Sequence, residues 1–218
     1  MKMKSNIPNY RDGHYKNTKG FTLVETLVTI FVFTLIISGS AVLFKEVFSN
    51  SNQKNIALSN IDQARLAEFN FVNEIRSATM GNDGSYPVSM ASSSEIVIYT
   101  GYGSSGLAVN RIRYYVVGST LYKGLVVPTG NPLSYNLSSE KVSQIQSGVT
   151  NGTSPVFYYY DADYAGTSTP LAYPVNLNKV RFVKMNLILL KQDISNATST
   201  FTVSAGATVR SLKDNLGN

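Results

Sequence analysis

The sequence of 218 residues contains no cysteine and no tryptophan, and its only histidine is His14. Without cysteine, the chain can form neither a disulfide framework nor a thiol-based site. One histidine near the N-terminus leaves the rest of the chain without the imidazole that Ser-His catalysis, Cys-His catalysis and most zinc or copper sites use. The sequence also lacks a phosphate-binding loop, a dinucleotide fingerprint and a nucleophile elbow. It therefore does not favour an enzyme, and no cofactor is expected.

Charged residues are scarce as well, at 15% of the chain. Five of the 19 Lys and Arg residues, but one of the 13 Asp and Glu residues, lie in residues 1–20. The positive charge is therefore mostly a targeting feature, whereas a nucleic-acid-binding domain needs a clustered basic face. Arg111, Arg113 and Lys123 could form a small basic strip, but a solvated strand face is the favoured interpretation. Nucleic acid is not expected as a partner.

A long apolar run from Phe21 to Phe44 contains a single charged residue, Glu25. As a helix, this run would span about 36 Å, enough to cross the hydrocarbon layer of a membrane. A carboxylate inside a membrane costs about 2.5–3.5 kcal/mol on insertion scales, so it is normally kept for a function and has a partner. If the chain is cut after Gly20, the new amine of Phe21 lies one helical turn from Glu25 and can neutralise it, within one chain or between neighbouring chains.

The hexapeptide Gly20-Phe21-Thr22-Leu23-Val24-Glu25 follows a basic leader and opens the apolar run. It resembles the prepilin signal of type IV pilins and type II secretion pseudopilins. The resemblance implies that a membrane aspartyl peptidase cuts after Gly20 and methylates the new amine of Phe21. It also implies that Glu25 pairs with the Phe21 amine of a neighbouring subunit during assembly. The implied partners are prepilin peptidase, other pilin or pseudopilin subunits, and the cytoplasmic membrane.

These features predict four segments along the chain. Residues 1–20 form a cytoplasmic leader that is cleaved, and residues 21–44 form a transmembrane and assembly helix. Residues 45–80 continue as an amphipathic helix into the soluble domain, and residues 81–218 form an extracytoplasmic β-rich domain. The positive-inside rule places the N-terminus of this single-pass protein in the cytoplasm. After processing, the resemblance implies incorporation into an extracytoplasmic pilus or pseudopilus.

The spacing of apolar residues predicts that the helix continues to about Thr79. The residues that show this spacing, and that are expected to pack in the core, are Leu58, Ile61, Ala64, Phe69, Val72 and Ile75. Polar residues such as Glu74 are expected between them. Gly81-Asn82-Asp83-Gly84 is expected to stop the helix.

Apolar and aromatic segments after Gly84 predict a mainly antiparallel sheet. The expected strands are Glu95–Thr100, Arg111–Val117, Thr120–Val127, Val156–Tyr160, Asn178–Lys191, Phe201–Ser204 and Ala207–Leu212. Gly118-Ser119 predicts a two-residue hairpin. A change of phase between Phe182 and Val183 predicts a β-bulge. The fold class is therefore α+β and pilin-like, with a long N-terminal helix packed on the sheet.

Parts of the second half refine the resemblance and leave alternatives open. Arg111–Lys123, Val156–Asp161 and Val209–Lys213 are similar to PilW-like minor pilins and to J-type minor pseudopilins. The implied function is a structural subunit, with a minor subunit favoured. The alternatives are a major pilin of an unusual pilus, a tip adhesin or DNA-uptake subunit, a membrane-anchored hydrolase, and an ordinary signal anchor with a chance glutamate.

One candidate metal site is present. Asp161 and Asp163, followed by Gly166, could begin a calcium loop, because hard cations prefer carboxylate oxygens. The spacing lacks the further acidic residues of a convincing loop. A solvated turn is the favoured alternative.

Overall fold

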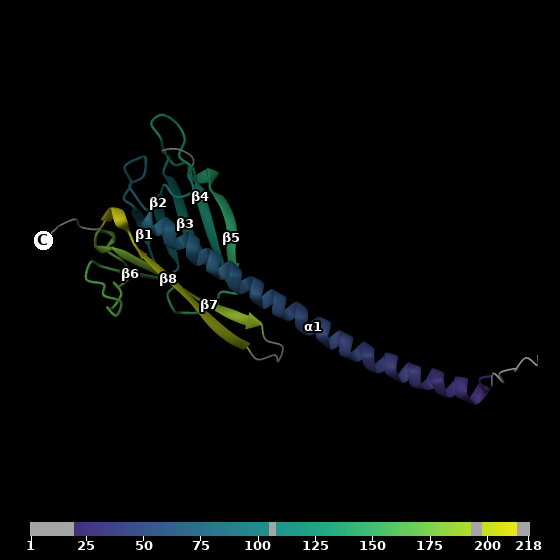
Figure 1. Ribbon diagram of the computed structural model, residues 1–218. Coiled ribbons are helices and arrows are strands. Elements are labelled where there is room, and N and C mark those ends of the chain that lie inside the picture. Colours follow the sequence, from purple (N-terminus) through teal and green to yellow (C-terminus); the bar gives the residue numbers. More distant parts are fainter. Residues whose placement is uncertain (1–19, 105–107, 193–197, 213–218) are drawn as a thin grey trace, which may run out of the picture. The chain divides into compact units, whose positions relative to one another are not determined.

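The computed structural model describes residues 20–104, 108–192 and 198–212 (Figure 1). The chain divides into two compact units, Met1–Ser49 and Asn50–Asn218. The long helix α1 (Leu23–Arg76) contributes to both units. The predicted leader up to residue 19, including His14, lies outside the described residues.

In the first unit, the described chain is the apolar part of α1. Leu23–Phe48 is long and apolar enough to cross a membrane, at about 39 Å for 26 helical residues. The helix continues without a break through Gly39. The hydroxyls of Thr29, Thr34 and Ser40 each donate to the carbonyl four residues earlier, at 2.5–2.8 Å. These bonds satisfy the hydroxyls inside the helix, as an apolar environment requires.

The second unit contains a five-stranded antiparallel sheet in the order β1-β2-β3-β4-β5. Its strands are β1 (Val88–Ala91), β2 (Glu95–Thr100), β3 (Asn110–Val117), β4 (Thr120–Val126) and β5 (Lys141–Ser147). The predicted ranges of β2, β3 and β4 are confirmed to within one residue. The predicted hairpin is confirmed too, because Gly118 has a φ of 60° and Val117 faces Thr120. The short 3-10 helix η1 (Leu137–Ser139) precedes β5.

A separate three-stranded antiparallel sheet has the order β6-β7-β8, so the structure has two sheets where the sequence indicated one. Its strands are β6 (Phe157–Tyr160), β7 (Phe182–Gln192) and β8 (Thr198–Thr208). The ranges Phe201–Ser204 and Ala207–Leu212 are expected to form the last strand or two, and the structure has one continuous strand, β8, that includes Phe201–Ser204 and the start of the second range. The short 3-10 helix η3 (Arg210–Leu212) follows it, in place of the end of the predicted last strand.

The predicted bulge in β7 is wrong. The pairing of β7 with both neighbours is continuous, and Val183, Met185, Leu187 and Leu189 alternate on its buried side. The strand starts only at Phe182, after the 3-10 helix η2 (Leu177–Lys179). The apparent change of phase therefore marks the junction between a turn and a strand.

The last turns of α1 pack against both sheets (Figure 1). The Phe71 ring lies 5.5 Å from the ring of Tyr114 in β3 and 5.9 Å from the ring of Phe157 in β6, between centroids. The helical residues buried in this contact are Ala64, Ala67, Phe71, Glu74 and Ile75. From Ala64 through Ala67 and Phe71 to the adjacent Glu74 and Ile75, the steps are three or four positions, as on one face of a helix.

The expected core positions on α1 are only partly right. Ala64 and Ile75 are buried, Val72 and Ile61 are half-buried, and the side chain of Leu58 lies outside the described residues. Phe69 is 61% exposed, so its placement in the core is wrong. It falls two positions from Phe71 and therefore lies well round the helix from the buried face.

The helix ends at Arg76, earlier than expected. Beyond it, Ala78 forms an isolated bridge with Thr100, and the Thr79 N–H donates to the Tyr99 carbonyl at 2.9 Å. These bonds pair the chain with β2 before Gly81, so the helix has already ended when the glycine-rich segment begins. Gly81 and Gly84 instead close a tight turn, with a φ of 83° at Gly84.

Candidate functional site

The predicted site residues lie at the start of α1. Gly20, Phe21 and Thr22 precede the helix, and Leu23 is its first residue. The Glu25 N–H donates to Thr22 Oγ1 at 3.3 Å, so Thr22 caps the helix and Glu25 occupies its third position. The spacing Thr-x-x-Glu is that of a capping box, a signal that the sequence analysis did not use.

Glu25 is an acidic side chain in the first turn of the helix, where a negative charge interacts favourably with the helix dipole. Within residues 20–104, 108–192 and 198–212, its carboxylate has no hydrogen-bond or ion-pair partner. The described residues of the first unit therefore present a carboxylate at the start of an apolar helix and do not supply a group that would neutralise it.

Gly20 is exposed, and it lies outside the helix. A Cβ atom built on this residue would meet nothing within 4 Å. The fold around Gly20 therefore does not itself require glycine. A requirement for glycine here would have to come from a molecule that approaches the backbone closely, as a peptidase does.

Comparison with protein families places a known motif over this region. The family described as the prokaryotic N-terminal methylation motif matches residues 15–41, which include Gly20, Glu25 and much of the apolar helix. The match supports a type IV pilin-like or pseudopilin-like protein. Such a prepilin-type motif is typical of structural proteins. A comparison with curated proteins found no match.

The chain also contains a buried polar cluster that the helical spacing of the sequence does not predict. The sequence predicts Glu74 to be a polar position between core residues, but it is only 3% exposed. Its carboxylate accepts a hydrogen bond from Tyr114 Oη at 2.8 Å and forms an ion pair with Lys123 Nζ. Burial, and then the charge of Glu74, raise the pKa of Tyr114 well above its ordinary value. The cluster joins α1 to β3 and β4.

The possible basic strip does not form. Arg113 makes a bidentate interaction with Glu140, through Nε at 3.0 Å and Nη2 at 2.7 Å, and Arg111 lies 3.5 Å from the same carboxylate. Gly124 makes room for this contact, because a Cβ atom there would collide with the Glu140 side chain. Lys123 is engaged elsewhere, with Glu74. The two arginines are therefore charge-compensated, and Lys123 is not part of their cluster.

The calcium candidate is a turn. The Asp163 N–H donates to Asp161 Oδ1 at 3.2 Å, a local bond that is typical of an aspartate at a turn. In the described part of the chain, no three His, Asp or Glu side chains gather as ligands for a metal ion.

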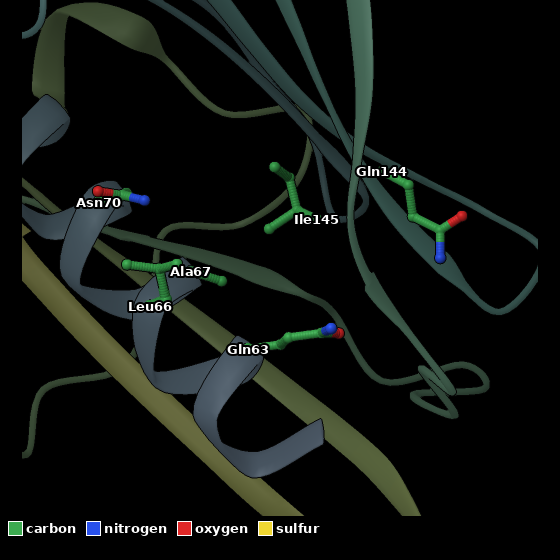
Figure 2. Close-up of a pocket in the computed structure, with 6 residues that line it drawn as sticks. All are labelled: Gln63, Leu66, Ala67, Asn70, Gln144 and Ile145. Atoms are coloured by element: carbon green, nitrogen blue, oxygen red, sulfur yellow. The ribbon is translucent and has the colours of Figure 1, made fainter. Parts of the chain in front are cut away.

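A groove of about 330 Å³ lies between α1 and β5 (Figure 2). It is lined by Gln63, Leu66, Ala67, Asn70, Gln144 and Ile145. Figure 2 shows Ile145 on the side of β5 that faces the helix, whereas Gln144 points away from it. The lining offers apolar and amide contacts but no titratable group, so this groove supplies no acid, base or nucleophile.

Proposed function

We propose that this chain is a subunit of a type IV pilus or of a type II secretion pseudopilus, and that it is polymerised through its N-terminal helix. The observation that carries this proposal is the coincidence of three features at one place: the methylation motif, the membrane-length apolar helix, and Glu25 in the first turn of that helix. Residues 1–20 would remain in the cytoplasm until they are cleaved, residues 21–44 would cross the membrane, and residues 45–218 would lie outside it.

Maturation is proposed to occur at the bond between Gly20 and Phe21. Prepilin peptidase would hydrolyse this bond, and the new amine of Phe21 would be methylated. The exposed, non-helical position of Gly20 supports this step, because a protease must bind its substrate in an extended form. The absence of a side chain at Gly20 allows close approach to the backbone.

Assembly is proposed to depend on an ion pair between Glu25 and the amine of Phe21 on a neighbouring subunit. An unpaired carboxylate in the membrane costs about 2.5–3.5 kcal/mol, so pairing would favour entry of the subunit into a filament. Head-to-tail contacts that do not close into a ring then extend into a fibre. Within this proposal, Thr22 caps the helix and fixes Glu25 one turn from the amine.

A minor subunit is proposed over a major one. Support comes from the large β-rich region, residues 81–218, and from the lack of proline in the apolar run. The number of copies per purified filament tests this: a minor subunit is present in few copies, whereas a major pilin forms most of the filament.

The substitution Glu25→Ala tests the assembly step. The variant should still insert into the membrane, because it loses only a charge from an apolar run. Its incorporation into purified filaments should fall by more than about tenfold, because the amine loses its partner. Asp62→Ala, at an exposed position of the same helix beyond the membrane-length segment, is the matched control and should be incorporated normally. Normal incorporation of Glu25→Ala would rule out the ion pair.

A further inference from the structure

Three of the four strands at the edges of the two sheets are protected against pairing with another chain. β1 has only four residues and a register shift. β5 also contains a register shift, opposite Leu121 and Tyr122. β6 has four residues, and the Leu171 N–H donates to its Tyr159 carbonyl at 2.8 Å. Short length, irregular pairing and coverage by a loop are the usual means of blocking an edge.

The fourth edge strand, β8, lacks these protections. It has 11 residues, and its sequence, TSTFTVSAGAT, contains no charged residue and no proline. Its register with β7 is unbroken from Thr198 to Thr208. A long, regular and uncharged edge is a template on which a further strand can form hydrogen bonds.

The bonds of β7 identify which groups of β8 face the open edge. Ile188 and Leu190 direct their N–H groups away from β8, to Asn151 Oδ1 and to the Gly148 carbonyl, both at 2.9 Å. Their partners across the ladder are Thr202 and Thr200. Because hydrogen-bonded and non-hydrogen-bonded pairs alternate in an antiparallel ladder, Thr200 and Thr202 turn their N–H and C=O groups outward. Both residues are exposed, and no described residue bonds these groups.

The next outward-facing position, Ser204, lies beside α1. The carboxylate of Glu68, on α1, interacts with the Ser204 N–H, while burial raises the pKa of Glu68. Ser204 is itself exposed, but Glu68 competes for its N–H, so the outward groups with no interaction partner in the described chain are those of Thr200 and Thr202.

We propose that this open edge binds β8 of a second copy of the chain, as an added antiparallel strand. A strand without charges does not repel its own copy, and threonine pairs are favourable across antiparallel strands. Because Glu68 competes for Ser204, the register that uses only the outward groups of Thr200 and Thr202 pairs Thr200 of one copy with Thr202 of the other. The contact has two-fold symmetry about Phe201 and makes four main-chain hydrogen bonds. This inference goes beyond the proposed function, because it does not depend on the N-terminal motif.

Disulfide trapping in the full-length chain tests both the contact and its register, since the chain has no cysteine of its own. Thr200→Cys and Thr202→Cys chains with different tags are mixed in detergent and mildly oxidised. Hydrogen-bonded partners are about 5.5 Å apart between Cα atoms, which suits a disulfide. The mixed dimer should therefore exceed either homodimer by more than about tenfold, because identical positions lie beyond the roughly 7 Å limit. Ser143→Cys mixed with Ser147→Cys, on exposed positions of β5, is the matched control and should remain monomeric.

A second substitution keeps the test independent of folding. Thr202→Pro removes only an outward N–H, so the ladder with β7 and the melting temperature should be unchanged, while self-association measured by sedimentation is lost. Repeating the trapping in the Glu25→Ala background separates β8 pairing from helix-driven assembly. The proposal is overturned if the mixed dimer does not form, if both homodimers form equally well, or if Thr202→Pro associates like the parent chain.

Discussion

Two glutamates on α1 differ sharply in their surroundings. Glu25 is exposed at the start of the apolar segment, and no described residue pairs with its carboxylate. Glu74 is buried, and its carboxylate is held by Tyr114 and Lys123. The partner of Glu74 belongs to the same chain, whereas the proposed partner of Glu25 is created only when the chain is cut.

The buried cluster gives a prediction for stability. Glu74→Ala leaves the ammonium of Lys123 and the hydroxyl of Tyr114 without their acceptor in a largely buried site. We expect the free energy of unfolding to fall by about 3 kcal/mol, the low end for breaking a buried pair, because Lys123 retains some contact with water. Chemical denaturation followed by circular dichroism measures this. Asp62→Ala, on an exposed position of the same helix, should change stability by less than about 0.5 kcal/mol. Equal effects of the two substitutions would show that the cluster contributes little.

The role of Glu74 could not be predicted from local sequence. Its partners lie 40 and 49 residues further along the chain, so helical spacing alone shows a charged residue beside apolar ones. Gly20, Phe21 and Glu25 could be singled out because the whole motif is contiguous. Their chemical roles stay predictions, since they depend on enzymes and neighbouring subunits.

The helix α1 differs in composition and burial between its first and second parts. Its first part is apolar on all sides, as in a membrane helix. In the second unit it buries only one face, which contains Phe71 and Ile75. One helix thus combines a segment suited to an apolar environment with a segment that completes a globular core.

Alanine substitutions at Phe69 and Phe71 test which face of α1 packs in the core. Phe71→Ala should reduce the free energy of unfolding by about 3–5 kcal/mol, because it opens a cavity where α1 meets Tyr114 and Phe157. Phe69→Ala removes the same atoms from a side chain that is 61% exposed, and should cost less than about 1 kcal/mol. Thermal or chemical denaturation gives both values. A larger cost at Phe69 would mean that the other face of the helix is the packed one.

The strands could be predicted where side-chain pattern and turn chemistry agreed. β2, β3 and β4 contain alternating or continuous apolar residues, and Gly118 marks the hairpin. The side-chain pattern does not predict β1, which has only four residues, or β5, whose residues are mostly polar. Pairing with neighbouring strands decides the conformation of both. The division into two sheets depends on long-range pairing, which no local pattern specifies.

At the scale of the whole molecule, the sequence indicates an α+β chain with a membrane-length helix, and the structure confirms that fold class. The second unit has one hydrophobic core shared by α1 and both sheets. Residues 20–48, the part of the first unit whose side chains are described, contain no such core, and their large apolar side chains are exposed. This contrast is consistent with a chain whose N-terminal helix is covered by lipid and then by neighbouring subunits, as the proposed function requires.

The proposed cleavage after Gly20 and methylation of Phe21 are tested most directly by the intact mass of the protein, extracted from membranes of cells that contain a prepilin peptidase. We expect residues 1–20 to be absent and one methyl group to be added at Phe21. Gly20→Val should retain the leader without loss of folding, because the structure has free space around Gly20. A mature N-terminus at any other position, or an unprocessed chain in the presence of active peptidase, would rule out processing between Gly20 and Phe21.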